Sequence, residues 1–444
     1  MISAAGYVNY NSIQDYQIWL HSSTAQVECP FYREHIRVGW HSTFLEAFSS
    51  CIQEEKEISF TANGNAHFLL YTNLVFHTPQ IISRDPNIKI AWTPNLMHNY
   101  VKSAELKFND ISVQKFDTLG ADILIQTDSR SGQGKREQYL RDIGNLSCLT
   151  EFRDHLPSKR LSFHCPWSFS KKISKCIPLC LSTSTTVSMT FKLERDPSKL
   201  IRVREGPFDI IESFQRALKY EDRISISDLE NDLLSLPTYY GKYVLITPKE
   251  LKWHKNIQNR EIFYDTFQEY DNDELFRNSE VASVVLSSIL PVKALFPVAQ
   301  NMTATSINNH SNYTTNSYDC YSGSSAISKY NLSYEAVSML HNLEAEVFSN
   351  DEIYWNCASC PERPGYAAIV FPSSLERDED VGIVLSSVGG SLNVLIKDDP
   401  GIGSEYKFKV RALVTNVFKY ENNMVTISKN SGDSLRENWN SWNL

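Results

Sequence analysis

Val187-Ser-Met-Thr-Phe-Lys-Leu-Glu194 is the clearest structural signal in the sequence, because its odd-numbered positions are all apolar and its even-numbered positions all polar. A period of two predicts a β-strand with one face on a hydrophobic core and the other in water. Tyr406-Lys-Phe-Lys-Val-Arg-Ala412 repeats the pattern near the other end of the chain. We therefore expect half-buried strands in both halves of the protein.

Two short turn sequences predict β-hairpins. Asn109-Asp110 separates the apolar-alternating runs 104–108 and 111–116, and both residue types tolerate the positive φ that a tight turn requires. Gly389-Gly390 separates 383–388 from 392–396 in the same manner. Each pair of flanking runs is predicted to form two adjacent antiparallel strands.

The strand signal comes in two blocks, from about residue 57 to 194 and from about 242 to 426. Between them, the apolar residues of Phe208–Leu236 have the spacing of short amphipathic helices. They are Ile210, Ile211, Phe214, Ala217, Leu218, Leu229, Leu233 and Leu234. The simplest organisation is two β domains with a partly helical connector.

Composition agrees with a β-rich folded chain and argues against several functions. The 444 residues are too many for one small domain, and aromatic residues make up 12%. The net charge of −9 repels a phosphate backbone, so we expect no direct nucleic-acid binding. We expect no transmembrane segment, since no apolar run reaches about 18 residues, and no signal peptide, since the first 16 residues have neither a basic nor an apolar stretch. The nine cysteines are odd in number and widely spaced, which predicts reduced thiols.

Residues 299–333 form the longest polar tract, which predicts an exposed loop. Asn301, Asn309, Asn312 and Asn331 each begin an N-x-S/T sequon there, and Asn145 begins another. These are candidate glycosylation sites. The alternative is chance, because Asn- and Ser-rich loops generate sequons freely and a cytosolic protein receives no N-glycan.

No arrangement of residues in the sequence specifies catalysis. Cys357-Ala-Ser-Cys360 has the spacing of half a zinc site, and the other close pair, Cys176 and Cys180, lies in an apolar segment. HExxH, GxSxG and P-loop motifs are absent from the sequence. Acidic runs such as 376–380 are typical of solvated surface, although a β-sandwich hydrolase would need such carboxylates. We expect no enzyme activity, no cofactor and no metal, and a structural or binding role.

An ordered series of segments resembles the major capsid proteins of nucleocytoplasmic large DNA viruses, the double jelly-roll family that includes iridoviruses and chlorella viruses. In the first block the segments are 60–68, 90–108 and 161–169, where a Trp-containing strand leads through a short helix into a strand pair. In the second block, 242–247 resembles the first strand and Ile289–Phe296 the strand that contains Pro-Val-Lys. The resemblance covers about residues 30 to 427.

The resemblance implies an all-β fold of two tandem eight-stranded jelly-roll β-sandwiches, with short helices in the loops and connector. It implies an N-terminal arm (1–25), a first jelly roll (26–205), a connector (206–240), a second jelly roll (241–430) and a C-terminal tail (431–444). The implied function is a structural one, that of a viral major capsid protein. Its homotrimeric, pseudo-hexameric capsomers would tile an icosahedral shell.

The implied partners are copies of the same chain, neighbouring capsomers, and minor capsid and penton proteins. A host receptor or glycan is a further possible partner. The implied location is the virion capsid, with synthesis and assembly in the host cytoplasm. Two alternatives stay open from sequence: a minor capsid or scaffold protein of the same lineage, and a carbohydrate- or receptor-binding β-sandwich protein, which the aromatic content and the polar loop also suit.

Overall fold

The computed structural model describes most of the chain between residues 41 and 427. The described ranges are 41–47, 51–54, 57–127, 133–171, 175–181, 184–194, 200–205, 210–213, 224–227, 237–256, 259–277, 279–288, 290–301, 327–334, 337–357, 359–360, 366–372, 375, 382–385, 390–396, 405–421 and 424–427. The arm 1–25, the tail 431–444 and most of the predicted loop 299–333, including Asn309 and Asn312, lie outside these residues.

Two antiparallel sheets form a first β-sandwich, which we call the first roll. One sheet has the strand order β1 (His41–Ala47), β15 (Thr238–Ile246), β4 (Phe68–His77), β10 (Arg160–His164). The other has the order β2 (Cys51–Glu54), β3 (Glu57–Thr61), β11 (Val187–Leu193), β7 (Val101–Phe108), β8 (Ile111–Asp117). The buried positions of β11 alternate as its sequence predicts, so that strand is confirmed.

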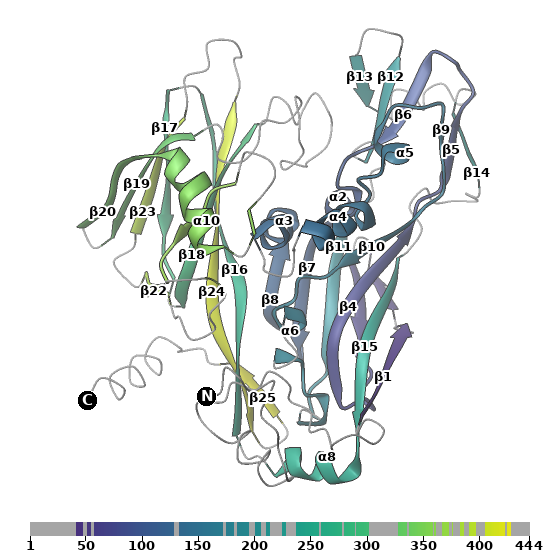
Figure 1. Ribbon diagram of the computed structural model, residues 1–444, viewed down its shortest axis with the longest axis vertical. Coiled ribbons are helices and arrows are strands. Elements are labelled where there is room, and N and C mark those ends of the chain that lie inside the picture. The colour runs from purple at the N-terminus through teal and green to yellow at the C-terminus, as the bar shows by residue number, and fades with distance from the viewer. Residues whose placement is uncertain are drawn as a thin grey trace.

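Two further sheets form a second β-sandwich, the second roll. One contains β16 (Asn259–Phe276), β24 (Tyr406–Glu421), β18 (Pro291–Asn301) and β21 (Ile369–Val370), with β22 (Ile383–Val384) also on β18 and β25 (Met424–Ile427) on β24. The other has the order β17 (Val281–Leu286), β23 (Gly390–Ile396), β19 (Ile327–Tyr334), β20 (Val337–Glu344). Figure 1 shows the four sheets standing side by side, the second roll on the left and the first on the right.

Both rolls have the same topology. Eight strands of each roll can be numbered 1 to 8 in chain order. In the first roll these are β1, β3, β4, β7, β8, β10, β11 and β15, and in the second roll they are β16, β17, β18, β19, β20, β21, β23 and β24. Each roll then has one sheet with the order 1-8-3-6 and one with the order 2-7-4-5, and in the first roll β2 adds an edge strand beside β3. This is the jelly-roll arrangement, and the predicted all-β double jelly roll is confirmed.

The remaining elements are short and lie mainly in the connections (Figure 1). Two small sheets, β13 (Ile210–Ser213), β12 (Ile201–Glu205), β6 (Ile88–Trp92) and β14 (Ile224–Ser227), β5 (Gln80–Ser83), β9 (His155–Leu156), extend the first roll at one end. The helices are α2 (Leu96–Tyr100), α3 (Thr118–Thr127), α4 (Gln133–Asp142), α5 (Ser147–Thr150), α6 (Ser168–Lys171), η3 (Leu179–Leu181), α8 (Pro248–Lys255), η6 (Val347–Asp351) and α10 (Glu352–Asn356). None of these described helices is long and apolar enough to cross a membrane.

One strand lies in a different roll from the one predicted. The segment 242–247 was expected to begin the second block, but β15 pairs with β1 and β4 of the first roll. Tyr239 and Val244 of β15 are fully buried in the core of that roll. The predicted position was wrong because a closing strand and an opening strand have the same local pattern, and only the pairing partners distinguish them.

The predicted helices of the connector are also wrong where the structure describes them. Ile210 and Ile211 lie in strand β13, which pairs with β12, and residues 224–227 form β14, which pairs with β5. The β-branched isoleucines favour a pleated strand. The other apolar positions assigned to this helical pattern, from Phe214 to Leu234, lie outside the described residues.

The two predicted hairpins have different outcomes. Asn109 and Asp110 have φ of 47° and 66°, and Phe108 pairs with Ile111, so the first hairpin is confirmed. The second is wrong, because β22 pairs with β18 whereas β23 pairs with β17 and β19 in the opposite sheet. The strands that precede and follow Gly389-Gly390 thus lie in different sheets.

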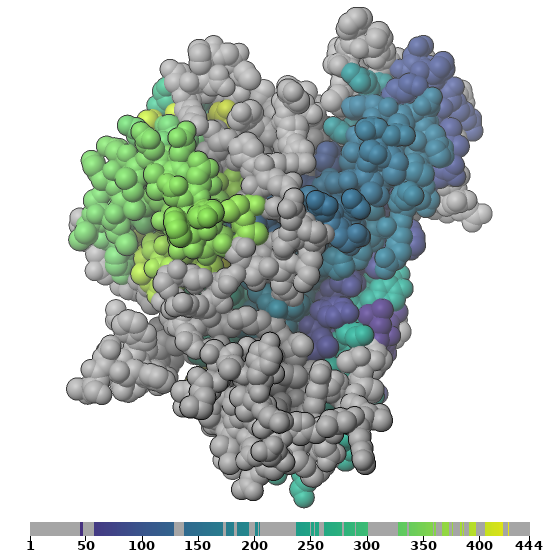
Figure 2. Space-filling view, viewed as in Figure 1, coloured from purple at the N-terminus to yellow at the C-terminus, as the bar shows by residue number. Residues whose placement is uncertain are grey.

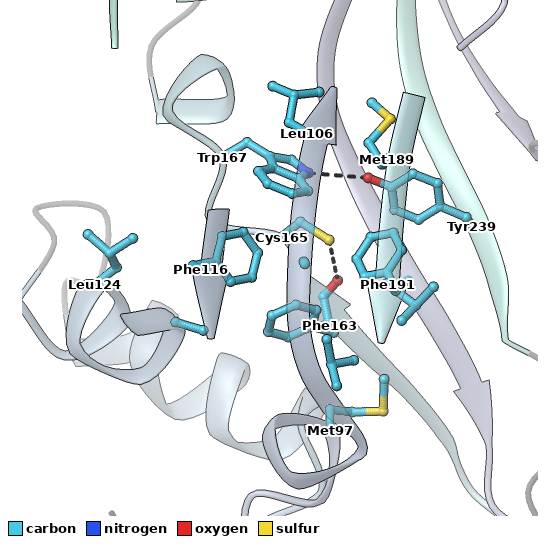
Figure 3. Close-up of a cluster of buried hydrophobic side chains, with 14 of the residues drawn as sticks. Met97, Leu106, Phe116, Leu124, Phe163, Cys165, Trp167, Met189, Phe191 and Tyr239 are labelled. Carbon is cyan, nitrogen blue, oxygen red and sulfur yellow. Dashed lines mark hydrogen bonds between the residues drawn. The ribbon is translucent and has the colours of Figure 1, made fainter. Parts of the chain in front are cut away.

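Trp167 is at the centre of the first roll's core (Figure 3). Its indole N–H donates to Thr72 Oγ1 at 3.0 Å and to the Tyr239 hydroxyl at 3.2 Å. Phe191 lies edge-on to Tyr239 with ring centroids 5.0 Å apart. Thr72 and Tyr239 belong to one sheet and Phe191 to the other, so the cluster joins the two layers of the sandwich.

Candidate functional site

The interface between the two rolls is the main candidate site, because it buries charged as well as apolar side chains. The sheet of β7 and β8, with α3 and α6, faces β16, β24 and β18 of the second roll (Figure 1). Phe108 of β7 meets Phe418 of β24 at a centroid distance of 5.1 Å, and Phe418 stacks on Tyr264 at 3.8 Å. The core of the first roll therefore continues across the interface into the second.

Close approach at Gly120 of α3 strengthens this contact. A Cβ at Gly120 would lie 2.8 Å from the Phe267 ring, closer than side-chain packing permits. The glycine allows the helix to rest directly on the second roll.

Arg411 of β24 forms a buried charged contact across the interface. Its Nε and Nη2 donate to Asp117 Oδ2 of β8 at 3.0 and 2.7 Å, and its Nη1 donates to Asp271 Oδ1 of β16. The Arg411 side chain is only 2% exposed. Burial disfavours the charge, but the carboxylates of Asp117 and Asp271 outweigh burial and raise the Arg411 pKa. A permanent cation thus joins the last residue of β8 to the second roll.

Asp265 of β16 forms a second buried charged cluster. Its Oδ1 is 3.0 Å from Lys293 Nζ and accepts a hydrogen bond of 3.1 Å from Thr415 Oγ1. Its backbone N–H donates to Ser168 Oγ of α6 in the first roll at 3.1 Å. Burial opposes ionisation, but the positive charges of Lys293, Lys175 and Lys171 outweigh burial and lower the Asp265 pKa. The carboxylate therefore stays ionised inside the interface.

Lys115 and Tyr366 add polar contacts on either side of these clusters. Lys115 Nζ lies 3.3 Å from Glu269 Oε1, and its backbone N–H donates to Thr266 Oγ1. Tyr366 of the second roll donates to Asp122 of α3. Charged pairs that must match across an interface fix its register, so the arrangement holds the two rolls in one relative position.

A buried histidine extends this network into the first roll. His98 Nδ1 is 3.5 Å from Asp122 Oδ1, and His98 Nε2 is 2.6 Å from the Tyr139 hydroxyl. Burial first, and then the Asp122 charge, raise the Tyr139 pKa well above its ordinary value, so the phenol stays neutral. The chain His98, Asp122 and Tyr366 connects α2, α3 and the second roll.

Two of the four candidate glycosylation sites fall within the described residues, on different sheets. Asn331 is in the middle of β19, where its side-chain Oδ1 accepts a 2.7 Å hydrogen bond from the Asn342 backbone N–H. Asn301 ends β18 in the other sheet of the second roll. Asn145 has its side chain hydrogen-bonded to Asn95. The side-chain amides of Asn331 and Asn145 therefore form hydrogen bonds within the folded protein.

The cysteine pairs do not come together as a metal centre in the described part of the chain. Cys176 and Cys180 are buried in the first roll, whereas Cys357 follows α10 and Cys360 is exposed. Burial, and then the proximity of Cys360, raise the Cys357 pKa to about 12. Among the described residues, no group of three or more His, Cys, Asp or Glu side chains is placed to hold a metal ion.

The interface charges were missed in the sequence because Lys407, Lys409 and Arg411 were assigned to a water-facing side of their strand. That interpretation is wrong for Arg411, which is 1% exposed. The following run, Ala412-Leu-Val-Thr-Asn-Val-Phe418, has apolar residues on both faces around Thr415 and Asn416, a pattern typical of a strand covered on both sides. That run was the available signal that a second layer covers β24.

The lowered pKa of Asp265 predicts a specific loss of stability in acid. A carboxylate whose pKa is lower in the folded than in the unfolded protein stabilises the fold at pH values above its unfolded pKa of about 3.9. This stabilisation is lost as the pH falls towards the pKa of the folded state. From pH 7 to pH 3, Asp265→Asn should therefore lose about 1 kcal/mol less free energy of unfolding than the wild type. Asp273→Asn, an exposed change on the same strand, is the control and should follow the wild type. Equal losses in D265N and wild type, measured by urea denaturation at each pH, would contradict the assignment.

Three curated proteins that are similar to this chain are viral major capsid proteins. The chain is 29% identical to the major capsid protein of Frog virus 3 over 180 residues and 29% identical to that of Rana tigrina ranavirus over 188 residues. It is 21% identical to the major capsid protein of Invertebrate iridescent virus 6 over 404 residues, 84% of this chain and 82% of that protein. The chain is a relative of the iridovirus major capsid proteins. The predicted resemblance is thereby confirmed.

The first two matches cover 37% and 38% of this chain and only 38% and 40% of the lengths of the two viral proteins. No protein-family model matches the chain.

Solved structures show the same fold at much lower sequence identity. PBCV-1 VP54 matches with a TM-score of 0.66 and 10% identity, covering 90% of this chain and 98% of its own. The Faustovirus major capsid protein matches with a TM-score of 0.63 and 8% identity, covering 93% and 95%. Almost the whole chain thus shares the double jelly-roll fold with these proteins.

Proposed function

We propose that this relative of iridovirus major capsid proteins is itself a viral major capsid protein, which forms homotrimeric, pseudo-hexameric capsomers of an icosahedral shell. The observation that carries the proposal is the pair of jelly rolls with identical strand order, held against each other by buried contacts. The match to the Invertebrate iridescent virus 6 protein along most of both chains supports it.

The duplicated fold gives each chain two similar building blocks. Three chains around a threefold axis would place six rolls in a ring, and the ring closes only if the angle between the two rolls of one chain is fixed. Arg411 with Asp117, and Asp265 with Ser168, provide this fixation because each connects the two rolls through buried polar contacts. A fixed interface of this kind suits a rigid subunit of a shell better than an enzyme whose domains move about a hinge.

The proposal includes the domain division, the partners and the location. We place the end of the first roll after Ile246 rather than at 205, because β15 closes the first roll, and we place the start of the second roll at β16 with α8 between them. The partners would be other copies of the chain, neighbouring capsomers, and minor capsid and penton proteins. The location would be the virion, after assembly in the host cytoplasm.

The test is the mass and shape of the purified full-length protein. We expect a stable particle of three times 50.8 kDa by native mass spectrometry, with a hexagonal outline in negative-stain images. A protein that stays monomeric at micromolar concentrations and is retained on a glycan resin would contradict the proposal and favour the carbohydrate-binding alternative.

A further inference from the structure

Two cysteines lie where the chain leaves α10 of the second roll and reaches the first roll. Cys357 caps the C-terminal end of α10, with an extended backbone (φ −100°, ψ 151°), and its N–H donates to the Ile353 carbonyl at 3.0 Å. Cys360 follows three positions later. We call the residues Asn356, Cys357, Ser359 and Cys360 the strap.

The strap is held by both rolls. Ser359 Oγ donates to the backbone carbonyl of Gln126, in α3 of the first roll, at 2.6 Å. Cys357 packs against the core that continues from the first roll across the interface. The Asn356 carbonyl accepts a 3.2 Å hydrogen bond from the backbone N–H of Leu375. A constraint on the strap therefore acts on the contact between α10 and α3 (Figure 1).

The two thiols differ in how far solvent reaches them. Both are free in the structure, Cys357 half-buried and Cys360 exposed. Burial, and then the proximity of Cys360, raise the pKa of the Cys357 thiol, so the two side chains are electrostatic neighbours. The region around α10, bright green in Figure 2, lies at the molecular surface. A small reagent in solution can thus reach the Cys360 thiol first.

The position of the pair favours a lasting disulfide over redox catalysis. The C-x-x-C spacing is that of disulfide oxidoreductases, whose reactive cysteine has a lowered pKa at the N-terminal end of a helix. Cys357 is at the C-terminal end of its helix, and its pKa is raised to about 12. A thiol of high pKa leaves slowly from a disulfide, so a bond that contains Cys357 should resist reduction.

We propose that Cys357 and Cys360 form an intrachain disulfide when the protein meets a low-molecular-weight disulfide such as oxidised glutathione. The Cys360 thiolate attacks one sulfur of the small disulfide, whose S–S bond breaks and releases a first small thiolate. Cys357 then gives up its proton and attacks the Cys360 sulfur of the mixed disulfide, and a second small thiolate leaves. The protons of the two cysteines pass to the two small thiolates. The protein is thereby oxidised by two electrons, and the small disulfide is reduced to two thiols.

The bond closes a ring that contains Ser359. Such a ring restricts the unfolded chain, which stabilises the folded one. In the folded protein it holds Ser359 near Gln126 and so strengthens the contact of the second roll with α3. Because thiols stay reduced in a cytosol and are oxidised outside it, the strap of a shell subunit would tighten after the particle leaves the cell, a consequence that rests on the proposed function.

The first test compares disulfide formation in the folded and the unfolded full-length protein. Both are equilibrated with a series of ratios of oxidised to reduced glutathione, and the peptide that contains both cysteines is analysed by mass spectrometry after free thiols are alkylated. We expect an equilibrium constant for the Cys357–Cys360 bond about tenfold larger in the native protein than in urea. An equal or smaller constant in the native protein, or pairing of Cys357 with another cysteine, would overturn the proposal.

The second test measures the effect of the bond on stability. Oxidation should lower the equilibrium constant for unfolding of the wild type by the same factor of about ten. Cys360→Ser, a change of similar size at an exposed position, should fold and unfold identically in oxidised and reduced buffer. Cys148→Ser, at a half-buried cysteine of α5, is the matched control and should keep the full response. A response that persists in C360S, or disappears in C148S, would assign the effect to other thiols and refute the proposal.

The third test asks whether the strap transmits the effect to the first roll. Oxidation of the wild type should slow amide hydrogen exchange in the last turn of α3 as well as in the strap. Ser359→Ala, which removes the hydrogen bond to Gln126, should confine the slowing to the strap. Unchanged exchange in α3 of the oxidised wild type would contradict the role of the strap. A wild type that is monomeric yet forms the bond would contradict only the proposed capsomer, so the two failures are distinguishable.

Discussion

Asp in place of Met189 or Val410 should abolish the folded, soluble protein. Both side chains are 0% exposed, Met189 in the core of the first roll (Figure 3) and Val410 in that of the second. A carboxylate without a partner in such a core costs at least several kcal/mol, a large part of the typical 5–15 kcal/mol that stabilises a domain. The expected result is aggregated protein in both cases, measured as the soluble fraction after expression.

Matched changes at the same positions separate charge from shape. Met189→Leu conserves the side-chain volume and should cost less than about 1.5 kcal/mol. Val410→Thr keeps the shape and adds one buried hydroxyl, for about 1–3 kcal/mol. Soluble trimer from either Asp variant, or aggregation of M189L, would show that these strands do not face the cores as described.

The strands themselves were predictable because their signal is local. The alternation in 187–194 and 406–412 gave β11 and the start of β24, and the residue types at Asn109-Asp110 gave a turn with positive φ. Each of these features depends only on residues adjacent in the chain. The family resemblance added the order of the segments and with it the double jelly roll.

The pairing of strands was not predictable from the same patterns. β15 begins 161 residues after β4 ends, and nothing in its own alternation identifies β4 as its neighbour. For the same reason β22 and β23 were interpreted as a hairpin although they lie in opposite sheets. Partners of this kind are chosen by the closure of the whole sandwich and not by the local sequence.

The interface site was harder still to predict, because its contacts join residues that are even farther apart in the sequence. The period of two shows that Arg411 lies on the polar face of its strand, but not that another roll covers this face. Its partner Asp117 is 294 positions away in the sequence. A polar residue facing water and one facing a buried carboxylate have the same sequence pattern, so only the assembled fold distinguishes them.

Arg411→Met should cost about 3 kcal/mol of unfolding free energy, because it leaves two carboxylates facing each other at a buried interface. The methionine keeps much of the apolar stem, so the loss measures the charge and not the packing. The carboxylates of Asp117 and Asp271 are 18% and 38% exposed, and water reaching them keeps the expected value at the lower end of the range for broken buried pairs. Guanidinium denaturation of the full-length protein gives the measurement.

Lys407→Met is the matched control on the same strand. Lys407 Nζ is 3.6 Å from Asp273 of β16, and Asp273 is 95% exposed, so this ion pair should contribute at most about 1 kcal/mol. Adding Asp117→Asn to R411M should recover part of the loss, since one of the two opposed charges is then removed. Equal effects of R411M and K407M, or a larger loss in the D117N/R411M double variant, would mean that the buried cation does not hold the two rolls together.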